Sequence, residues 1–576
     1  MVDEIKNNEA LDAEEKYKTA VEDAYDYVEN FDILETITNV GNDEVFTPRK
    51  TCDMMLDSLP EEVWHNPNYK WLNPATKNGI FEREIAIRLD KGLKDVIPDK
   101  EKRRKHILQN MIYSIGQTKF TANVARRTVY YCSQANRKCD GLKAPDGHYI
   151  NGYAIGNGTW FDNEEGNIKT PCADHLFVNN RGKKMFFNCS EKEKSKYKCK
   201  YCSIAGDSKY NDINQKETYA YEFIHTERNE LLEHLQDRFF GGNRNMKFDI
   251  IIGNPPYQLD TKKDTTEKGN PPSMPIYQLF FKQAVALKPK YISMIIPSKW
   301  FAGGMSVLDE FREYMMSCRK IICLNDFANA KDCFPSNSVA GGVCYFLWGR
   351  DYNGRCLFTN VNSDSKYSIS RDLNEFPILV RNNKAVDILE KISSYNEENM
   401  TSFASSTMPF GLKSDVRGSI TKQNENDIEL ISSKDITYIK KSEIKKSVDY
   451  LNKYKVLVGI LGAEHALEPD KDGRFRIITN SMRVIGPKTA CTQSYFLIGK
   501  FDNKKEADNL CSYLKTRFSR FLIWLAMSST HLSRSVLVFL PKQNFSEAWT
   551  DDKLYKKYNL TADEINLIES SIKEMN

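Results

Sequence analysis

The sequence lacks the features that would place it in a membrane or send it for secretion. It has no run of about 18 apolar residues, so we expect no membrane-spanning helix. The N-terminus, MVDEIKNNEALDAEEKYK, has neither a basic n-region nor an apolar h-region, so it is not a typical secretory signal. The 14 cysteines are scattered without a compact repeated spacing, which argues against a disulfide framework. We therefore expect a cytoplasmic protein.

An excess of charge of one sign is also missing. The 82 Lys and Arg residues against 78 Asp and Glu leave a formal net charge of only +4. This balance neither demands nor excludes a nucleic-acid partner, because a local basic surface is hidden in the total for the whole chain. The sequence also has no internal repeat and no long low-complexity linker. At roughly 100–200 residues per domain, its length predicts two to four domains.

Short apolar runs alternate with amphipathic helical stretches through much of the N-terminal half. This alternation predicts an α/β fold with a doubly wound parallel sheet. The segment 221–226 is a candidate for the third strand. It contains His225, which we interpret as a structural residue and not a catalytic one. We expect strands over 70–72, 107–115, 248–252, 291–296, 321–325 and 343–348, and helices over 52–59, 81–89, 122–131, 277–287 and 307–316.

Three segments differ from this pattern. Residues 1–41 are acidic and helix-prone, which predicts an N-terminal helical segment. Residues 132–217 are polar and hold six cysteines, so we interpret them as a Cys-rich insert within an α/β domain over 42–359. Residues 360–576 have clustered lysines and serines and end in a helix with the capping box Thr561 to Glu564. We predict a separate α+β domain there.

The most informative segment is Asn254-Pro255-Pro256-Tyr257, which directly follows an apolar strand. In an open α/β sheet, ligands bind outside the carboxyl ends of the strands. The oxygens of the Asn254 side chain and the Pro255 carbonyl suit the two hydrogens of an exocyclic amine, and consecutive prolines hold them in place. Tyr257 offers a flat face for stacking a base, which is worth about 1–3 kcal/mol.

Two upstream segments also stand next to predicted secondary structure. Asn73-Pro74-Ala75-Thr76-Lys77-Asn78-Gly79-Ile80-Phe81 follows a strand and opens a helix, and Gly79 permits a close backbone approach. Phe46-Thr47-Pro48 precedes another helix, with Thr47 as the expected cap and Pro48 at the first helical position. In this order, the three segments resemble the motifs of gamma-class adenine-specific (N6) DNA methyltransferases of restriction–modification type.

The resemblance implies a Rossmann-like methyltransferase domain that binds S-adenosyl-L-methionine and methylates an adenine flipped out of duplex DNA. This sequence departs from the pattern at Asn73, where an acid is common, and after the second strand, where Gln117 or Thr118 replaces the usual acid on the cofactor ribose. The Ile-x-Pro segment before Trp300 and Phe301 is similar to one that lines the base pocket, with core packing as the equal alternative. The implied catalytic residues are Asn254, Pro255, Pro256 and Tyr257, and the implied cofactor-binding residues are Phe46, Thr47, Pro48, Asn73, Pro74, Ala75, Gly79, Phe81, Gln117, Thr118 and Asn254.

The resemblance further implies that residues 360–576 form a target-recognition domain that binds double-stranded DNA. Arg517, Arg520, His531 and Arg534 lie in a tract that resembles the end of such domains. No nuclease signature stands out, so a restriction endonuclease would be a separate subunit. Two alternatives remain: an amino-methyltransferase acting on RNA or on a protein glutamine, and a non-catalytic DNA-binding protein with a degenerate cofactor pocket.

The Cys-rich insert contains one metal-binding pattern. Cys199 and Cys202 form a Cys-x-x-Cys pair, and Cys189 is a further candidate ligand. A structural zinc ion needs a fourth ligand, for which the upstream candidates are irregularly spaced: Cys172, His175, Cys132 and Cys139. The alternative is a set of free thiols in an ordered loop.

Overall fold

The computed structural model divides the protein into two compact units. Unit 1 comprises Met1–Pro297 and Cys318–Leu357, and unit 2 comprises Ser298–Ser317 and Phe358–Asn576. The predicted helical segment over 1–41 lies outside the described residues. The structure describes residues 45–131, 165–171, 177–185, 189–199, 205–207, 223–224, 226–259, 274–301, 306–335, 337, 339–362, 365–462, 470–478, 481–527 and 530–575.

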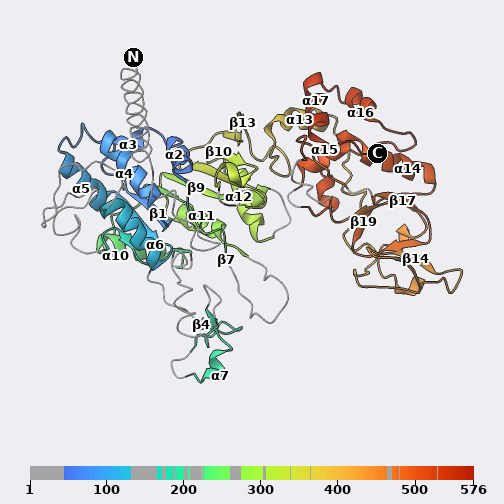
Figure 1. The fold of residues 1–576 in the computed structure, drawn as a ribbon, viewed down its shortest axis with the longest axis horizontal. Coiled ribbons are helices and arrows are strands. Elements are labelled where there is room, and N and C mark those ends of the chain that lie inside the picture. The colour runs from blue at the N-terminus through green and yellow to red at the C-terminus, as the bar shows by residue number, and fades with distance from the viewer. Residues whose placement is uncertain are drawn as a thin grey trace, which may run out of the picture. The chain divides into compact units, whose positions relative to one another are not determined.

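Unit 1 is built on a large mixed sheet in which strands follow the order β10-β11-β9-β6-β1-β2-β3 (Figure 1). Strand β1 pairs in parallel with β2 on one side and with β6 on the other, and β6 pairs in parallel with β9. Strand β11 is antiparallel to both of its neighbours. The strands are β1 (Trp71–Thr76), β2 (Ile112–Gly116), β3 (Ile168–Lys169), β6 (Ile250–Gly253), β9 (Tyr291–Pro297), β10 (Ile321–Phe327) and β11 (Val343–Gly349).

This strand order places a topological switch point between β1 and β6. Strands β2 and β3 continue the sheet on one side of β1, whereas β6 and β9 continue it on the other. Connections that leave β1 and β6 therefore diverge, which opens a crevice at the carboxyl ends of these two strands. The predicted Asn73 loop begins within β1, and the Asn254 segment directly follows β6. The fold thus brings together two segments that lie about 180 residues apart in the chain.

Buried apolar side chains explain the strands at the centre of the sheet. Every residue of β6 and β11 is buried, as expected for strands covered on both faces. Within the described ranges, each helix is too short or too polar to cross a lipid bilayer. The α-helices of unit 1 are α2 (Arg49–Asp57), α3 (Glu62–His65), α4 (Ile80–Gly92), α5 (Lys100–Asn110), α6 (Lys119–Arg126), α7 (Glu191–Lys194), α10 (Leu231–Phe240) and α11 (Tyr277–Ala286).

Two of the strand predictions were wrong. The segment 107–115 is split, because Ile107 and Leu108 point their side chains into the core from the end of α5, and only 112–116 form β2. The third strand is β3, which pairs with β2 in parallel, whereas Phe223 and Ile224 are helical. The insert predicted over 132–217 therefore contributes a strand to the sheet. Among its other described residues, β4 (Phe177–Val178) pairs with β5 (Lys198–Cys199).

Unit 2 contains both helices and strands around two apolar cores. One core gathers side chains of α13, α14, α15, β16 and β19, and the other gathers those of β14, β15 and β18. The last helix carries the expected capping box between Thr561 and Glu564. The elements are α12 (Asp309–Ser317), β12 (Cys356–Val361), β13 (Lys366–Arg371), α13 (Val386–Ser394), β14 (Ile428–Ile431), β15 (Ile436–Ile439), β16 (Tyr454–Gly459), β17 (Arg483–Ile485), β18 (Thr489–Cys491), β19 (Tyr495–Phe501), α14 (Lys504–Lys515), α15 (Arg517–Leu525), α16 (Asp551–Lys557) and α17 (Ala562–Ser571).

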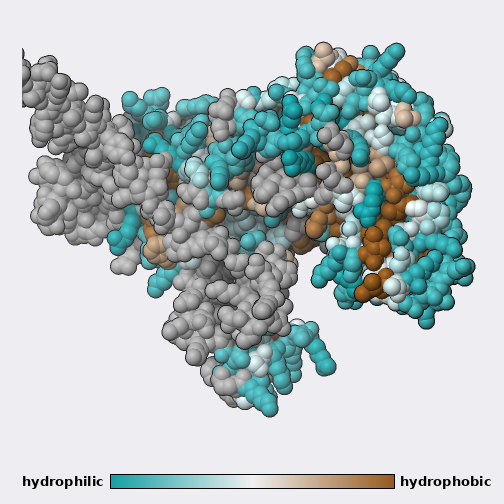
Figure 2. All heavy atoms as spheres, turned by 45° about the vertical axis from the view of Figure 1, so that its right-hand side comes forward, coloured by the Kyte–Doolittle hydropathy of each residue, from teal (hydrophilic) through white to brown (hydrophobic). Residues whose placement is uncertain are grey.

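The part of unit 2 visible in Figure 2 has a mostly hydrophilic surface interrupted by a band of apolar residues. The exposed apolar side chains of unit 2 include Ile420, which is 87% exposed, and Leu461, which is 59% exposed. Single exposed apolar residues of this kind are ordinary on protein surfaces.

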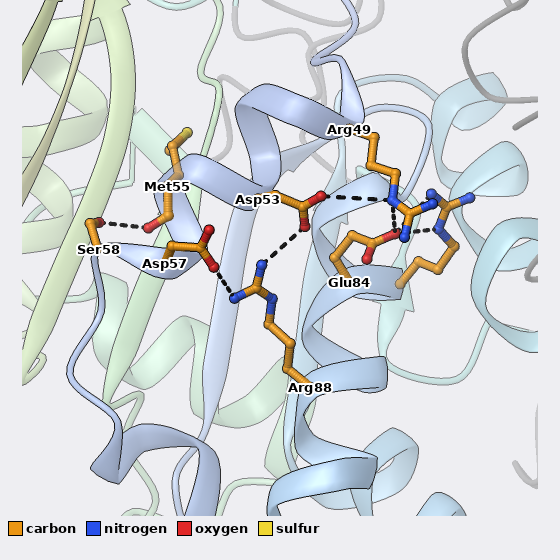
Figure 3. A network of polar contacts seen from close by, with 8 residues as sticks. Arg49, Asp53, Met55, Asp57, Ser58, Glu84 and Arg88 are labelled. Atoms are coloured by element: carbon orange, nitrogen blue, oxygen red, sulfur yellow. Dashed lines mark hydrogen bonds and ion pairs between the residues drawn. The ribbon is translucent and has the colours of Figure 1, made fainter. Parts of the chain in front are cut away.

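A network of ion pairs fastens α2 to α4, the helices that follow the Thr47 and Gly79 segments (Figure 3). Arg88 of α4 bonds to Asp53 at 3.0 Å and to Asp57 at 2.5 Å, both on α2. Glu84 of α4 lies 3.5 Å from Arg49 of α2. Because these contacts run along both helices, they hold α2 and α4 in a fixed position relative to each other.

We predict that Arg88→Met lowers the free energy of unfolding by about 1 kcal/mol, because one guanidinium holds two carboxylates in a partly buried site. Thermal unfolding of the variant and the wild-type protein at low and high salt measures this difference. The difference should shrink at high salt, where ions screen the pairs. Arg350→Met, which removes an exposed pair with Asp351, is the matched control and should leave the melting temperature unchanged. An equal loss in both variants would contradict the network.

Candidate active site

Asn254 is held in a fixed orientation at the carboxyl end of β6. Its side chain is buried, and its Nδ2 atom donates hydrogen bonds to the Val45 carbonyl at 3.1 Å and to the Thr47 hydroxyl at 3.2 Å. These two bonds determine which end of the amide faces the strap formed by Val45, Phe46 and Thr47. The opposite end, Oδ1, is buried and has no hydrogen-bond partner among the described residues. The amide thus presents a free acceptor.

The same carbonyl oxygen of Val45 accepts a second hydrogen bond, from Lys77 Nζ at 2.9 Å. Lys77 is buried and belongs to the loop after β1, so the strap touches both the loop and Asn254. The expected capping role of Thr47 was wrong. The N-cap of α2 is Pro48, no side chain caps it, and the Thr47 hydroxyl is engaged with Asn254 instead.

The loop after β1 turns sharply into α4 at Gly79. This residue is the N-cap of α4 and has a φ of +80°, a conformation that favours glycine. A Cβ atom at this position would lie 2.9 Å from the Ala125 Cα atom and 3.1 Å from the Thr128 Cβ atom. The Thr128 hydroxyl also donates to the carbonyl of Asn78 at 2.7 Å. The predicted close backbone approach at Gly79 is therefore made, in this structure, to α6 and the turn that follows it.

Asn73 connects the loop to β6 and to α4. Its Oδ1 atom accepts from the Ala75 backbone N–H at 3.1 Å, and its Nδ2 atom donates to Glu82 Oε1 at 2.9 Å. A Cβ atom added to Gly253, the residue before Asn254, would lie only 2.5 Å from Asn73 Oδ1. The glycine in β6 therefore leaves the space that Asn73 occupies.

Glu82 is the acid of this site, and the sequence reasoning missed it. Its side chain is buried in the first turn of α4, and Oε1 accepts from Ser114 at 2.6 Å as well as from Asn73. Its Oε2 atom is buried without a hydrogen-bond partner among the described residues. Burial raises the pKa of Glu82, and Ser114, the Glu82 backbone N–H, the Thr76 side chain and Asn73 oppose that rise. Lys77 and Val45 were missed as well.

These residues surround one small cavity of about 10 Å³, roughly the space that a single water molecule occupies. The cavity holds one acidic side chain, Glu82, and one basic side chain, Lys77, together with the amide of Asn254. Of the predicted cofactor-binding residues, Thr47, Asn73, Ala75, Gly79, Phe81 and Asn254 line it. Phe46 is buried in the strap, and Pro48 begins α2. The complete lining is Thr47, Asn73, Ala75, Thr76, Lys77, Asn78, Gly79, Ile80, Phe81, Glu82 and Asn254.

The two candidates for the missing ribose acid have different surroundings. Thr118 is the N-cap of α6, where its hydroxyl accepts from the Thr121 backbone N–H at 2.9 Å as part of a capping box. Gln117 directly follows β2 and is buried, and its Oε1 atom has no hydrogen-bond partner among the described residues. Gln117 therefore offers a free acceptor, whereas the Thr118 hydroxyl already serves the helix.

The remaining residues of the Asn254 segment form a rigid, mostly buried turn. Pro255 and Pro256 are buried, and Tyr257 keeps part of its surface exposed. The Tyr257 hydroxyl is buried and unpartnered within the described ranges, and burial, next to the thiols of Cys333 and Cys344, raises its pKa. The hydroxyl end of Tyr257 is therefore enclosed, while part of the side chain remains exposed.

Trp300 and Phe301 belong to unit 2 and lie in an aromatic cluster. Both side chains are buried, with their ring centroids 4.7 Å apart. Trp300 also packs against Phe311 at 5.6 Å, and Phe301 against Phe358 at 6.1 Å. The structure thus shows the packing alternative, and their contact with a base stays a prediction.

The arginines expected to contact DNA differ in exposure. Arg520 is buried and donates to the backbone carbonyls of Lys515, Thr516 and Lys573, so its guanidinium holds the chain of unit 2 together. Arg517 pairs with Glu574 at 3.2 Å. In this structure the Nε and Nη1 atoms of Arg520 are therefore engaged inside unit 2 and do not face a phosphate. His531 and Arg534 are exposed.

The candidate zinc ligands are only partly described. Cys189 is a free thiol and Cys199 is buried in β5. Cys202 lies outside the described residues, as do Cys132, Cys139, Cys172 and His175. In the part of the chain that the structure describes, no three His, Cys, Asp or Glu residues gather closely enough to hold a metal ion. Zinc binding stays a prediction.

We predict that Gly79→Ala lowers the free energy of unfolding by about 2–4 kcal/mol, because it combines a left-handed alanine with a crowded Cβ atom. Calorimetric unfolding measures the loss. Gly473→Ala is the matched control, since Gly473 has a φ of +78° and no atom within 4 Å of an added Cβ. It should cost only about 1–2 kcal/mol. Equal losses in the two variants would mean that crowding against Ala125 is unimportant.

Comparison with known proteins identifies a matching family and several similar structures. A profile of the family described as Eco57I restriction-modification methylase matches residues 110–334, which include Asn254 and Tyr257. Among solved structures, the Type IIL restriction-modification enzyme MmeI in complex with DNA is 11% identical, with a TM-score of 0.39 over 85% of this chain and 65% of that one. The Type ISP restriction-modification enzyme LlaGI is 10% identical, with a TM-score of 0.39 over 81% of this chain and 43% of that one.

A curated protein of Mycoplasma pneumoniae, described as an uncharacterized adenine-specific methylase, has much higher similarity. It is 41% identical over 386 residues, which cover 65% of this chain and 85% of the relative. An identity of this size over most of the relative requires the same fold and the same family. The chain therefore belongs to the adenine-specific DNA methylases of restriction–modification type.

Proposed function

We propose that this enzyme transfers the methyl group of S-adenosyl-L-methionine to the N6 amine of an adenine rotated out of duplex DNA. The free Oδ1 atom of the oriented Asn254 amide carries the proposal. A buried acceptor without a partner is costly, and an amine hydrogen would satisfy it. Tyr257, part of whose side chain remains exposed, supplies the stacking surface for the extruded base.

Two unpartnered acceptor atoms of unit 1 suit the polar groups of S-adenosyl-L-methionine. The cavity beside Asn254 contains a buried carboxylate oxygen on Glu82, and Gln117 offers a free acceptor after β2, at the position where the cofactor ribose is expected. When bound, S-adenosyl-L-methionine would supply an electrophilic methyl group on its sulfonium and would be left as a neutral thioether. Thr47 and Val45 hold Asn254 so that its oxygen takes up the positive charge that develops on the amine. The amine then loses one proton to water.

The order of the motifs supports the gamma class. Phe46-Thr47-Pro48, the Asn73 loop and Asn254-Pro255-Pro256-Tyr257 follow one another in the chain, with unit 2 after them. We assign residues 42–359 to the methyltransferase domain and residues 360–576 to a target-recognition domain that binds double-stranded DNA. The exposed lysines 440, 441, 445 and 446 and the exposed Arg534 suit phosphate contacts. The partner would be a separate restriction endonuclease subunit.

We predict that Asn254→Ala and Tyr257→Ala reduce methyl transfer by at least about 100-fold, because the first removes the oriented acceptor and the second the stacking surface. Transfer of labelled methyl groups to duplex DNA measures the loss, with single-stranded RNA and protein as comparison substrates. Both variants should keep the wild-type affinity for S-adenosylhomocysteine within about tenfold, which shows that they fold. Full activity in either variant, or methylation of RNA or protein in preference to DNA, would contradict the proposal.

We predict that Thr47→Val lowers kcat about 3- to 10-fold and leaves the KM for DNA nearly unchanged, because it removes one of the two hydrogen bonds that orient Asn254. Steady-state methylation kinetics test this. Thr51→Val is the matched control, since Thr51 is also a buried threonine near the start of α2 but donates to the Cys333 carbonyl. It should affect stability without changing kcat. An unchanged kcat in Thr47→Val would mean that Val45 alone orients the amide.

A further inference from the structure

The site contains a buried carboxylate, Glu82, in the first turn of α4, where the sequence alone predicted no functional acid. The resemblance described above implies an acid at position 73, where this chain has Asn73. The amide of Asn73 donates to Glu82, nine residues later in the first turn of α4. A negative charge is therefore present at the carboxyl end of β1 after all, supplied by the helix instead of the loop.

The two neighbouring strands hold this carboxylate in one orientation. Asn73 of β1 and Ser114 of β2 are direct partners in the parallel ladder, and both donate to the same atom, Glu82 Oε1, at 2.9 and 2.6 Å. Because both donors meet Oε1, the other oxygen is left without one. Oε2 is buried, has no hydrogen-bond partner within the described ranges, and belongs to a residue that lines the cavity.

An unpaired carboxylate oxygen in such a place favours a cationic ligand. Neutral hydrogen bonds to one oxygen offset only part of the cost of burying the charge, which amounts to several kcal/mol. An ammonium group would supply both a counter-charge and N–H donors. Lys77, which lines the same cavity, adds a positive charge that complements a carboxylate. A buried anion and a buried cation in one cavity match the zwitterionic end of an α-amino acid.

We propose that Glu82 binds the ammonium group of the cofactor's methionine moiety, replacing the acid that the resemblance implies at position 73. The assignment rests on the proposed function, because it takes S-adenosyl-L-methionine as the cofactor. It also explains why position 73 is an asparagine. An aspartate there would place two carboxylates in contact, whereas the amide donates to Glu82 and orients it.

Binding of two nucleosides to the protein without DNA tests the proposal by calorimetry. S-adenosylhomocysteine carries the amino-acid end, and 5′-methylthioadenosine lacks it. We expect Glu82→Gln to weaken S-adenosylhomocysteine binding roughly 10- to 100-fold and to change 5′-methylthioadenosine binding by less than about 3-fold. Glu84→Gln, two residues along α4 and paired with Arg83 at 2.8 Å, is the matched control and should leave both affinities unchanged.

The outcomes separate this proposal from the proposed function. If the wild-type protein binds neither nucleoside, the assignment of the cofactor fails, and the role of Glu82 fails with it. If the wild-type protein binds both and Glu82→Gln weakens both equally, or neither, Glu82 is only a structural residue and the proposal is wrong.

A charge exchange keeps the test valid if Glu82→Gln folds poorly. The double variant Asn73→Asp with Glu82→Gln restores one carboxylate and one amide in the same pair. We expect Asn73→Asp alone to weaken S-adenosylhomocysteine binding and the double variant to recover at least about tenfold of the affinity. A wild-type protein that binds a deaminated S-adenosylhomocysteine analogue as tightly as the parent compound would overturn the proposal without any variant.

Discussion

The carbonyl oxygen of Val45 is the point on which the site depends. It accepts one hydrogen bond from Lys77 of the loop after β1 and another from Asn254 at the end of β6. A backbone carbonyl has two lone pairs, so both bonds are satisfied by a single atom that no side-chain substitution removes. This atom belongs to the strap. Its two hydrogen bonds therefore fix the strap, the loop after β1 and the Asn254 amide relative to one another. An Asn side chain free to rotate would offer its donor and its acceptor to the substrate alternately, and only the acceptor suits an amine.

The charges of the site follow from the same arrangement. Folding buries one carboxylate, Glu82, and one ammonium, Lys77, along a single cavity, and the structure leaves Glu82 Oε2 without a donor. Such a site is less stable empty than filled, since a ligand that brings the complementary groups removes the cost of burial. The ion pairs between α2 and α4 stabilise the two helices beside the cavity and so offset part of the cost of burying these charges. The stability of α2 and α4 thus allows the fold to keep a buried Glu82 oxygen without a hydrogen-bond donor.

The sequence predicted the parts of this site that depend on local chemistry. An all-apolar run followed by Asn254-Pro255-Pro256-Tyr257 identifies a strand end and a rigid turn without knowledge of any contact, and Gly79 identifies a tight turn into a helix. Prediction failed where a long-range contact decides. The Thr47 hydroxyl was expected to cap α2, but it bonds to Asn254, 207 residues away. The third strand has only two residues and lies in a polar segment, so no apolar run indicates it. Arg520 was expected on the surface, but nearby carbonyls hold it inside.

Glu82 illustrates how a buried acid of this site could be recognised from the sequence of a related protein. An acid in the first turn of a helix has an ordinary explanation, since it interacts favourably with the helix dipole, and this explanation concealed it here. The departure at Asn73 was the available signal. Loss of a charge at one position of a ligand-binding loop requires either loss of the ligand or a charge from elsewhere. In a parallel sheet, that charge must come from a residue close to the same strand end, and the first turn of the following helix is the nearest place in the chain. A paired search, for an amide in the loop and an acid in the next helical turn, distinguishes a relocated charge from a degenerate pocket.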